Sequence, residues 1–164
     1  MDLLSDLSKT VFIEPAKAAN PDIHMIIKYP QWYDRFHERG YEVVRETADF
    51  DRIWVGTETR DYDDARWGGT PQYEAYFIMR WLGGIGGEKC GGGWFDPYMC
   101  GGSVNNYLEQ AYLTLLSKPR EITLFCYGSL HDTVLVPALG FELNKMDDLL
   151  VKLGEPVGVF TYLP

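Results

Sequence analysis

Two acidic residues, Glu58 and Asp96, stand at the ends of apolar segments of the kind that form buried strands. The first segment covers residues 52–58 and the second residues 90–96. A pair of carboxyl groups at neighbouring strand ends suits glycoside hydrolysis, in which one group acts as an acid and the other as a nucleophile or base. A separation of about 5–5.5 Å between them would imply retention at the sugar carbon, and about 6.5–9.5 Å would imply inversion.

Each acid also has a purely structural interpretation. Glu58 could form an ion pair with Arg60 that fixes the loop after its strand. Asp96 precedes a proline and could cap its own turn. The sequence leaves the catalytic and the structural interpretations open for both residues.

Other residues that could line a sugar site fall at or just after the ends of the predicted strands. Lys28 directly follows two isoleucines, and a buried amine needs a partner, so it could bind a substrate hydroxyl or pair with Glu58. Trp32 could offer a stacking surface or simply pack at the start of a helix. The remaining candidates for substrate binding are Arg60, Asp61, Trp94 and Tyr127.

The elements that would position these residues recur along the chain. Apolar segments cover residues 23–29, 52–58, 90–96 and 121–127, and stretches with helical periodicity separate them. This alternation predicts an α/β fold of about four parallel βα units, with a possible short terminal strand at 157–162. A closed eight-stranded barrel needs about 250 residues, so the chain of 164 residues corresponds to half a TIM barrel.

The predicted helices carry recognisable boundary residues. Pro15 interrupts the first, Gly40 weakens the second, and Ser103 and Gly154 cap the fourth and fifth. The cluster Gly83–Gly87 is expected to stop the third. The helices expected are 3–19, 32–46, about 70–82, 104–117 and 137–153.

Composition excludes several classes of function. A net charge of −9 argues against binding of nucleic acid, which needs a basic surface, and is compatible with a neutral carbohydrate. No apolar run reaches the ~20 residues that cross a bilayer, and residues 1–6 lack the features of a signal peptide, so a cytoplasmic protein is expected. No metal site or cofactor is expected, since the cysteines lack zinc spacing and the glycines of 83–93 do not open a helix after a strand.

An open half-barrel would expose two strand edges and one apolar face of its sheet. Such surfaces favour pairing with another chain, so we expect a homo-oligomer formed through the strand edges. Light scattering would measure this directly, and a monodisperse monomer would count against it.

Four stretches of the chain carry a resemblance to a known family, namely Ile26–Tyr33, Gly56–Asp61, Gly91–Asp96 and Glu109–Leu115. Together they resemble the C-terminal half of a bacterial family of glycoside hydrolases with a TIM-barrel catalytic domain, distantly similar to β-galactosidase relatives. The resemblance implies a domain over residues 1–156 made of the later barrel strands, and the start of a following region at 157–164. In such families an upstream strand contributes one catalytic acid, which implies a fragment that is inactive in isolation; the alternative is a non-catalytic carbohydrate-binding or interaction module.

Overall fold

The computed structural model describes residues 2–59, 73–98, 103–155 and 157. Two predicted site residues, Arg60 and Asp61, lie outside the described residues. The same holds for the predicted start of the third helix near residue 70 and for the predicted strand at 157–162, apart from Val157. The expected domain boundary after residue 156 stays a prediction.

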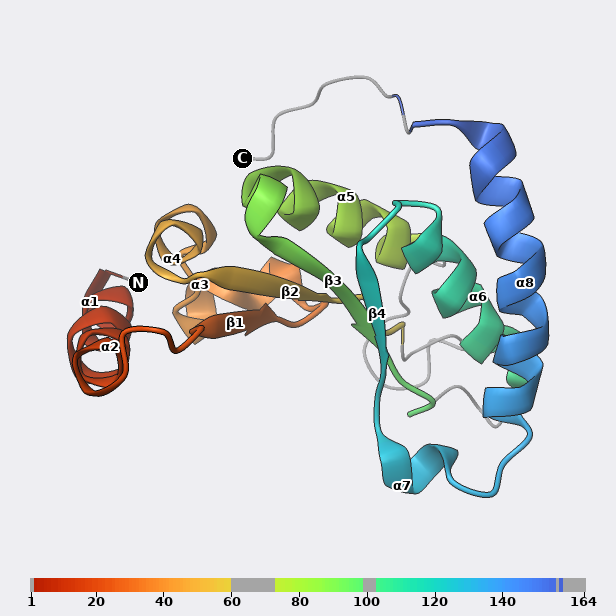
Figure 1. Cartoon of the computed structure of the whole chain (residues 1–164), viewed down its shortest axis with the longest axis horizontal. Helices are drawn as coiled ribbons and strands as arrows, with labels where there is room; N and C mark the ends of the chain where they lie inside the picture. The colour runs from red at the N-terminus through yellow and green to blue at the C-terminus, as the bar shows by residue number, and fades with distance from the viewer. Residues whose placement is uncertain (1, 60–72, 99–102, 156, 158–164) are drawn as a thin grey trace.

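The sheet consists of four parallel strands. Neighbouring strands follow one another in chain order, β1-β2-β3-β4. Helices alternate with the strands along the chain (Figure 1). The predicted α/β fold is therefore confirmed, and the arrangement is the one expected of part of a βα barrel. The strands are β1 (Ile26–Tyr29), β2 (Arg52–Gly56), β3 (Cys90–Phe95) and β4 (Glu121–Leu124).

Three strands end earlier than their apolar segments predicted. β2 stops at Gly56, and β3 stops before Asp96. The prediction that the fourth strand continues to Tyr127 is wrong, because Tyr127 begins the short helix α7 (Tyr127–Leu130). The backbone turns there, since the amide of Ser129 donates to the carbonyl of Cys126 at 3.1 Å.

The first helical segment runs through Pro15 rather than ending at it. The π-helical stretch η1 ends at Ile13, two residues before this proline, and the amide of Glu14 donates to the carbonyl of Lys9, five residues earlier. Proline lacks the amide hydrogen of an ordinary helical turn, and a local widening of the helix accommodates that loss. The segment consists of α1 (Asp2–Leu7), η1 (Ser8–Ile13) and α2 (Glu14–Ala19).

Gly40 divides the second predicted helix, as its position suggested. Its φ of +83° ends α3 in the left-handed conformation that favours glycine. The glycine cluster Gly83–Gly87 ends the third predicted helix at its far end, because α5 runs to Gly86 and Gly87, with a φ of +50°, follows as its C-cap. The elements here are η2 (Tyr33–Arg35), α3 (Phe36–Arg39), α4 (Val43–Asp49), α5 (Glu74–Gly86) and η3 (Gly87–Lys89).

Two apolar clusters join the sheet to the helices that cover one of its faces. In the first, Ile53 and Val55 of β2 pack with Ile78 and Leu82 of α5. The second centres on Phe95, and in it α6 and α8 contribute buried residues that include Tyr107 and Leu139. In Figure 1, α8 lies on the outer side of α6. The bounds are α6 (Val104–Leu115), which Ser103 caps as predicted, and α8 (Leu135–Leu153), which ends at Gly154.

Lys89 connects two segments of the chain at the end of the sheet where the strands begin. Its ammonium group donates to the carbonyls of Thr47, Ala48 and Phe50, each at 2.8 Å. These are carbonyls at the carboxyl end of α4, which the helix itself leaves without partners. Lys89 therefore links the end of α4 to the start of β3.

The opposite face of the sheet carries side chains that are exposed or half-buried. They include Ile26 and Lys28 of β1, Trp54 of β2 and Trp94 of β3. β1 and β4 are the edge strands of the described sheet, and the expected self-association stays a prediction. Within the described ranges, no helix is both long enough and apolar enough to pass through a bilayer.

Candidate functional site

The ends of β1, β2 and β3 meet around Gly56. A Cβ atom added to Gly56 would lie 2.5 Å from a carboxylate oxygen of Glu58, 2.7 Å from the indole of Trp94 and 3.0 Å from the backbone of Pro30. The space that a side chain at position 56 would need is therefore filled by these groups. The absence of a side chain at Gly56 lets the carboxylate of Glu58 and the ring of Trp94 come close together.

Glu58 and Asp96 are both buried, with exposed fractions of 2% and 0%. Successive side chains point to opposite faces of a sheet. Glu58 comes two residues after Gly56, and Asp96 comes two residues after Trp94, which lies on the face that the described helices leave uncovered. The carboxylate of Asp96 accepts a hydrogen bond from the amide of Tyr98 at 3.0 Å. Asp96 thus caps its own turn, which was the structural interpretation that the sequence left open.

Gln110, which the sequence did not single out, links the segments that carry the two acids. Its side-chain oxygen accepts a hydrogen bond from the amide of Thr59 at 3.1 Å. Its side-chain nitrogen donates to the carbonyl of Asp96 at 3.0 Å. A detectable signal was present: Gln110 and Thr114 are polar residues at i and i+4 within the stripe of α6 that faces the sheet.

A second polar contact from α6 lies next to that of Gln110. The hydroxyls of Thr57 and Thr114 are 2.6 Å apart, and both side chains are fully buried. Thr57 also donates to the carbonyl of Trp94 through its amide at 2.8 Å and through its hydroxyl at 3.0 Å. The backbone just beyond β2 is therefore held to β3 and to α6.

The predicted binding residues are only partly brought together. Lys28 is exposed rather than buried, and its ammonium nitrogen lies 5.4 Å from the ring centre of Trp94. Trp32 packs against Tyr41, as expected of a residue at a helix start. Tyr127 is 77% exposed. The structure thus places Lys28 and Trp94 together and puts Trp94 beside Glu58.

Glu74 is a further acidic residue that the sequence did not indicate. It lies in the first turn of α5, half-buried. Burial, and next the negative charge of Asp34, raise the pKa of its carboxyl from the usual value of 4.5 to about 7. A carboxyl whose pKa is shifted by burial and by a nearby charge, at the start of a helix, is a further functional candidate.

Replacing Glu74 with glutamine should stabilise the protein in a pH-dependent way. The folded state keeps this carboxyl protonated to a higher pH than the unfolded state does, so its contribution to stability is lost as the pH rises from about 4.5 to about 7. We expect Glu74→Gln to raise the free energy of unfolding by ~1–2 kcal/mol at pH 8, after allowance for solvent contact, and hardly at all at pH 4. Urea unfolding at both pH values measures this, with the exposed Glu88→Gln as control; an equal gain at pH 4 would contradict it.

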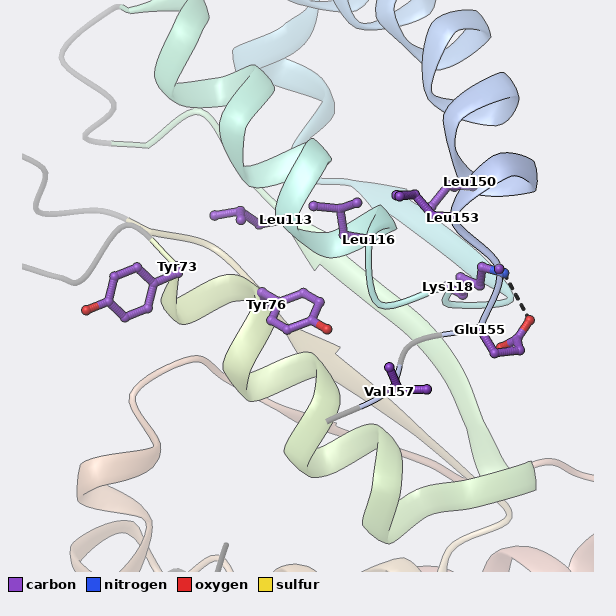
Figure 2. A pocket seen from close by; sticks show the side chains of 10 residues that line it. Tyr73, Tyr76, Leu113, Leu116, Lys118, Leu150, Leu153, Glu155 and Val157 are labelled. Carbon is purple, nitrogen blue, oxygen red and sulfur yellow. Dashed lines mark hydrogen bonds and ion pairs between the residues drawn. The ribbon is translucent and has the colours of Figure 1, made fainter. Parts of the chain in front are cut away.

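An apolar groove of about 410 Å³ lies among the helices (Figure 2). Tyr76 of α5, Leu116 beside α6 and Leu153 of α8 contribute to its walls. An ion pair of 2.9 Å between Lys118 and Glu155 lies at one side. None of the predicted site residues that the structure describes lines this groove, so it is separate from the strand ends.

The described part of the chain contains no cluster of three or more His, Cys, Asp or Glu side chains that could hold a metal ion. The groups at the strand ends are the carboxyl of Glu58, with the indole ring of Trp94 and the ammonium group of Lys28 nearby, and the carboxyl of Asp96 beyond the end of the adjacent strand. This set can exchange protons, stabilise a positive charge and stack against an apolar ring.

Comparison with known proteins identifies relatives of the chain. A family model described as "Probable glycosyl hydrolase, catalytic domain" matches residues 1–143. An uncharacterized protein of Saccharolobus solfataricus is 33% identical over an alignment of 135 positions, which covers 79% of this chain and 22% of that protein. The chain thus spans about a fifth of the length of this curated relative. No solved structure matches the chain.

Proposed function

Because this chain belongs to the family of probable glycosyl hydrolase catalytic domains, we propose that it forms part of a centre that hydrolyses a glycosidic bond. Glu58 and Asp96 are the proposed acids. One carboxyl protonates the departing glycosidic oxygen, and the other attacks the sugar carbon or activates the water that does so. The chain alone is proposed to be inactive, since further strands would be needed to close a barrel.

The observation that carries this proposal is that the two acids stand just beyond the carboxyl ends of two adjacent parallel strands. Carboxyl ends of parallel strands are where α/β barrels gather their reacting groups. A carboxylate oxygen of Glu58 and the indole of Trp94 both border the space beside Gly56. Asp96 directly follows Phe95, the last residue of β3.

Lys28 and Trp94 are proposed to bind the sugar. An indole ring offers an apolar face on which the C–H groups of a pyranose can stack, and an ammonium group can donate hydrogen bonds to hydroxyls. The ammonium of Lys28 lies over the same indole, at 5.4 Å from its centre. Arg60, Asp61, Trp32 and Tyr127 are the other proposed binding residues.

A non-catalytic carbohydrate-binding module is the second candidate function. The capping role of the Asp96 carboxylate favours it, because a carboxylate that holds its own turn is less available for proton transfer. In that case the same aromatic and charged residues would bind a sugar without cleaving it.

Titration calorimetry against a panel of neutral oligosaccharides, with chromatography of the mixtures, separates these functions. Binding together with released sugar supports hydrolysis by the chain. Binding without release supports the module for the isolated chain, and the same assay on a full-length protein then tests the hydrolase proposal. If neither protein bound or cleaved any sugar of the panel, the proposed function would be contradicted.

A further inference from the structure

We infer that Gln110 is a positioning residue that sets how the carboxyls of Glu58 and Asp96 are placed relative to each other. This inference rests on the proposed function of those two acids. Gln110 belongs to a helix that follows both strands in sequence, and it stands 14 residues from Asp96 and 51 from Thr59. It therefore joins segments that are distant along the chain.

The side chain of Gln110 is fully buried, with an exposed fraction of 0%. Its oxygen receives a hydrogen from the amide of Thr59, and its nitrogen gives one to the carbonyl of Asp96. An amide oxygen can only accept and an amide nitrogen can only donate, so these two partners fix the orientation of the group. Both of these hydrogen bonds go to backbone atoms. They therefore hold the backbone at Thr59 and the backbone at Asp96 at a set distance, whichever rotamers the two acids adopt.

The position of each bond explains why it matters for the acids. Thr59 directly follows Glu58, and the accepting carbonyl belongs to Asp96 itself. β2 has already ended at Gly56, so no ladder hydrogen bond holds the backbone of residue 59 to the neighbouring strand. Gln110 takes over that role beyond the strand ends.

Gln110→Met tests this inference, because methionine has a similar length and lacks both polar atoms. Buried backbone groups that lose a partner open more readily. We expect hydrogen exchange of the Thr59 amide to accelerate by about tenfold relative to that of the Thr57 amide, which is bonded to Trp94. The ¹³C resonances of the Glu58 and Asp96 carboxyl carbons should shift as well.

Tyr29→Phe is the matched control. Tyr29 is equally buried, and its hydroxyl bonds to Val43 and Thr47 beneath α4. A general loss of stability would accelerate exchange of Thr57 and Thr59 equally, which is the result expected for Tyr29→Phe. If Gln110→Met gave that same pattern and left both carboxyl resonances unchanged, the inference would be overturned.

Gln110→Glu adds a pH-dependent readout that a merely structural role would not produce. A neutral carboxyl can accept from Thr59 and donate to Asp96, as glutamine does, whereas a carboxylate can only accept. The Thr59 amide and both carboxyl resonances should approach their wild-type positions at low pH and depart from them as residue 110 ionises. Resonances that stay displaced at every pH at which the variant is folded would contradict the inference.

Enzymatic assays form a separate arm. If the full-length wild-type protein cleaves a glycoside, Gln110→Met should lower kcat by about tenfold or more with little change in KM, since misplaced acids affect the reaction more than binding. A full-length wild-type protein that cleaves no glycoside would contradict the proposed function alone. The exchange and carboxyl measurements would still decide the placement inferred for Gln110.

Discussion

Glu58→Gln in a full-length protein is expected to abolish glycosidase activity, with kcat lowered by about 10²–10⁴-fold. Glutamine has nearly the shape of glutamate and fits the buried space beside Gly56 and Trp94. It cannot exchange a proton or attack the sugar carbon. Initial rates on the best substrate of the oligosaccharide panel provide the measurement.

Glu88→Gln is the control, because it makes the same chemical change at the end of the sheet where the strands begin. Glu88 lies just before β3 in η3, and its side chain is 94% exposed in an ion pair with Arg120. Glu88→Gln should leave kcat and KM unchanged. Unchanged turnover in Glu58→Gln, with circular dichroism showing an intact fold, would remove Glu58 from the mechanism.

Gly92→Ala should have the largest effect on stability. Gly92 has a φ of +157°, and a Cβ atom there would lie 1.9 Å from the backbone carbonyl oxygen of Glu121. No flexible side chain can move away, so β3 and β4 would have to separate. We expect a loss of about 4 kcal/mol or more, a large part of the ~5–15 kcal/mol that stabilises a typical domain.

Urea unfolding and the yield of soluble protein measure this loss, with Gly84→Ala as the control. Gly84 lies inside α5, and a Cβ atom there would meet no atom within 4 Å. Alanine is a better helix former than glycine, so Gly84→Ala should stabilise the protein by ~0.5–1 kcal/mol. Equal unfolding midpoints for the two variants would show that the close approach at Gly92 is relaxed in solution.

Much of the fold could be predicted because its signals are local. Apolar segments of strand length separated by helical periodicity gave the parallel order, and Ser103 and Gly154 marked helix ends correctly. The end of α5 within the cluster Gly83–Gly87 was predicted in the same way, but the role of Gly86 depends on contacts between distant residues. A Cβ atom on Gly86 would lie 2.5 Å from the side chain of Ile53, so this glycine serves close packing against β2.

The candidate site was less accessible to prediction. The positions of Glu58 and Asp96 at strand ends follow from the local pattern. The polar pair Gln110 and Thr114 could have marked the buried stripe of α6, but which backbone atoms Gln110 contacts is decided only when α6 packs on the sheet. Lys28 was predicted to be buried because its neighbours are apolar, but it points to the face of the sheet that the described helices leave open.

The three hydrogen bonds of Lys89 lie at the opposite end of the sheet from the candidate acids. They secure α4 to β3 at the edge where the strands begin, whereas Gln110 acts where the strands end. Acetylation of Lys89 would remove the charge and two of its three donor hydrogens while leaving the acids in place. Loss of the Lys89 contacts should thus lower the amount of folded protein, while the hydrogen bonds of Gln110 at the other end of the sheet stay as they are in the molecules that remain folded.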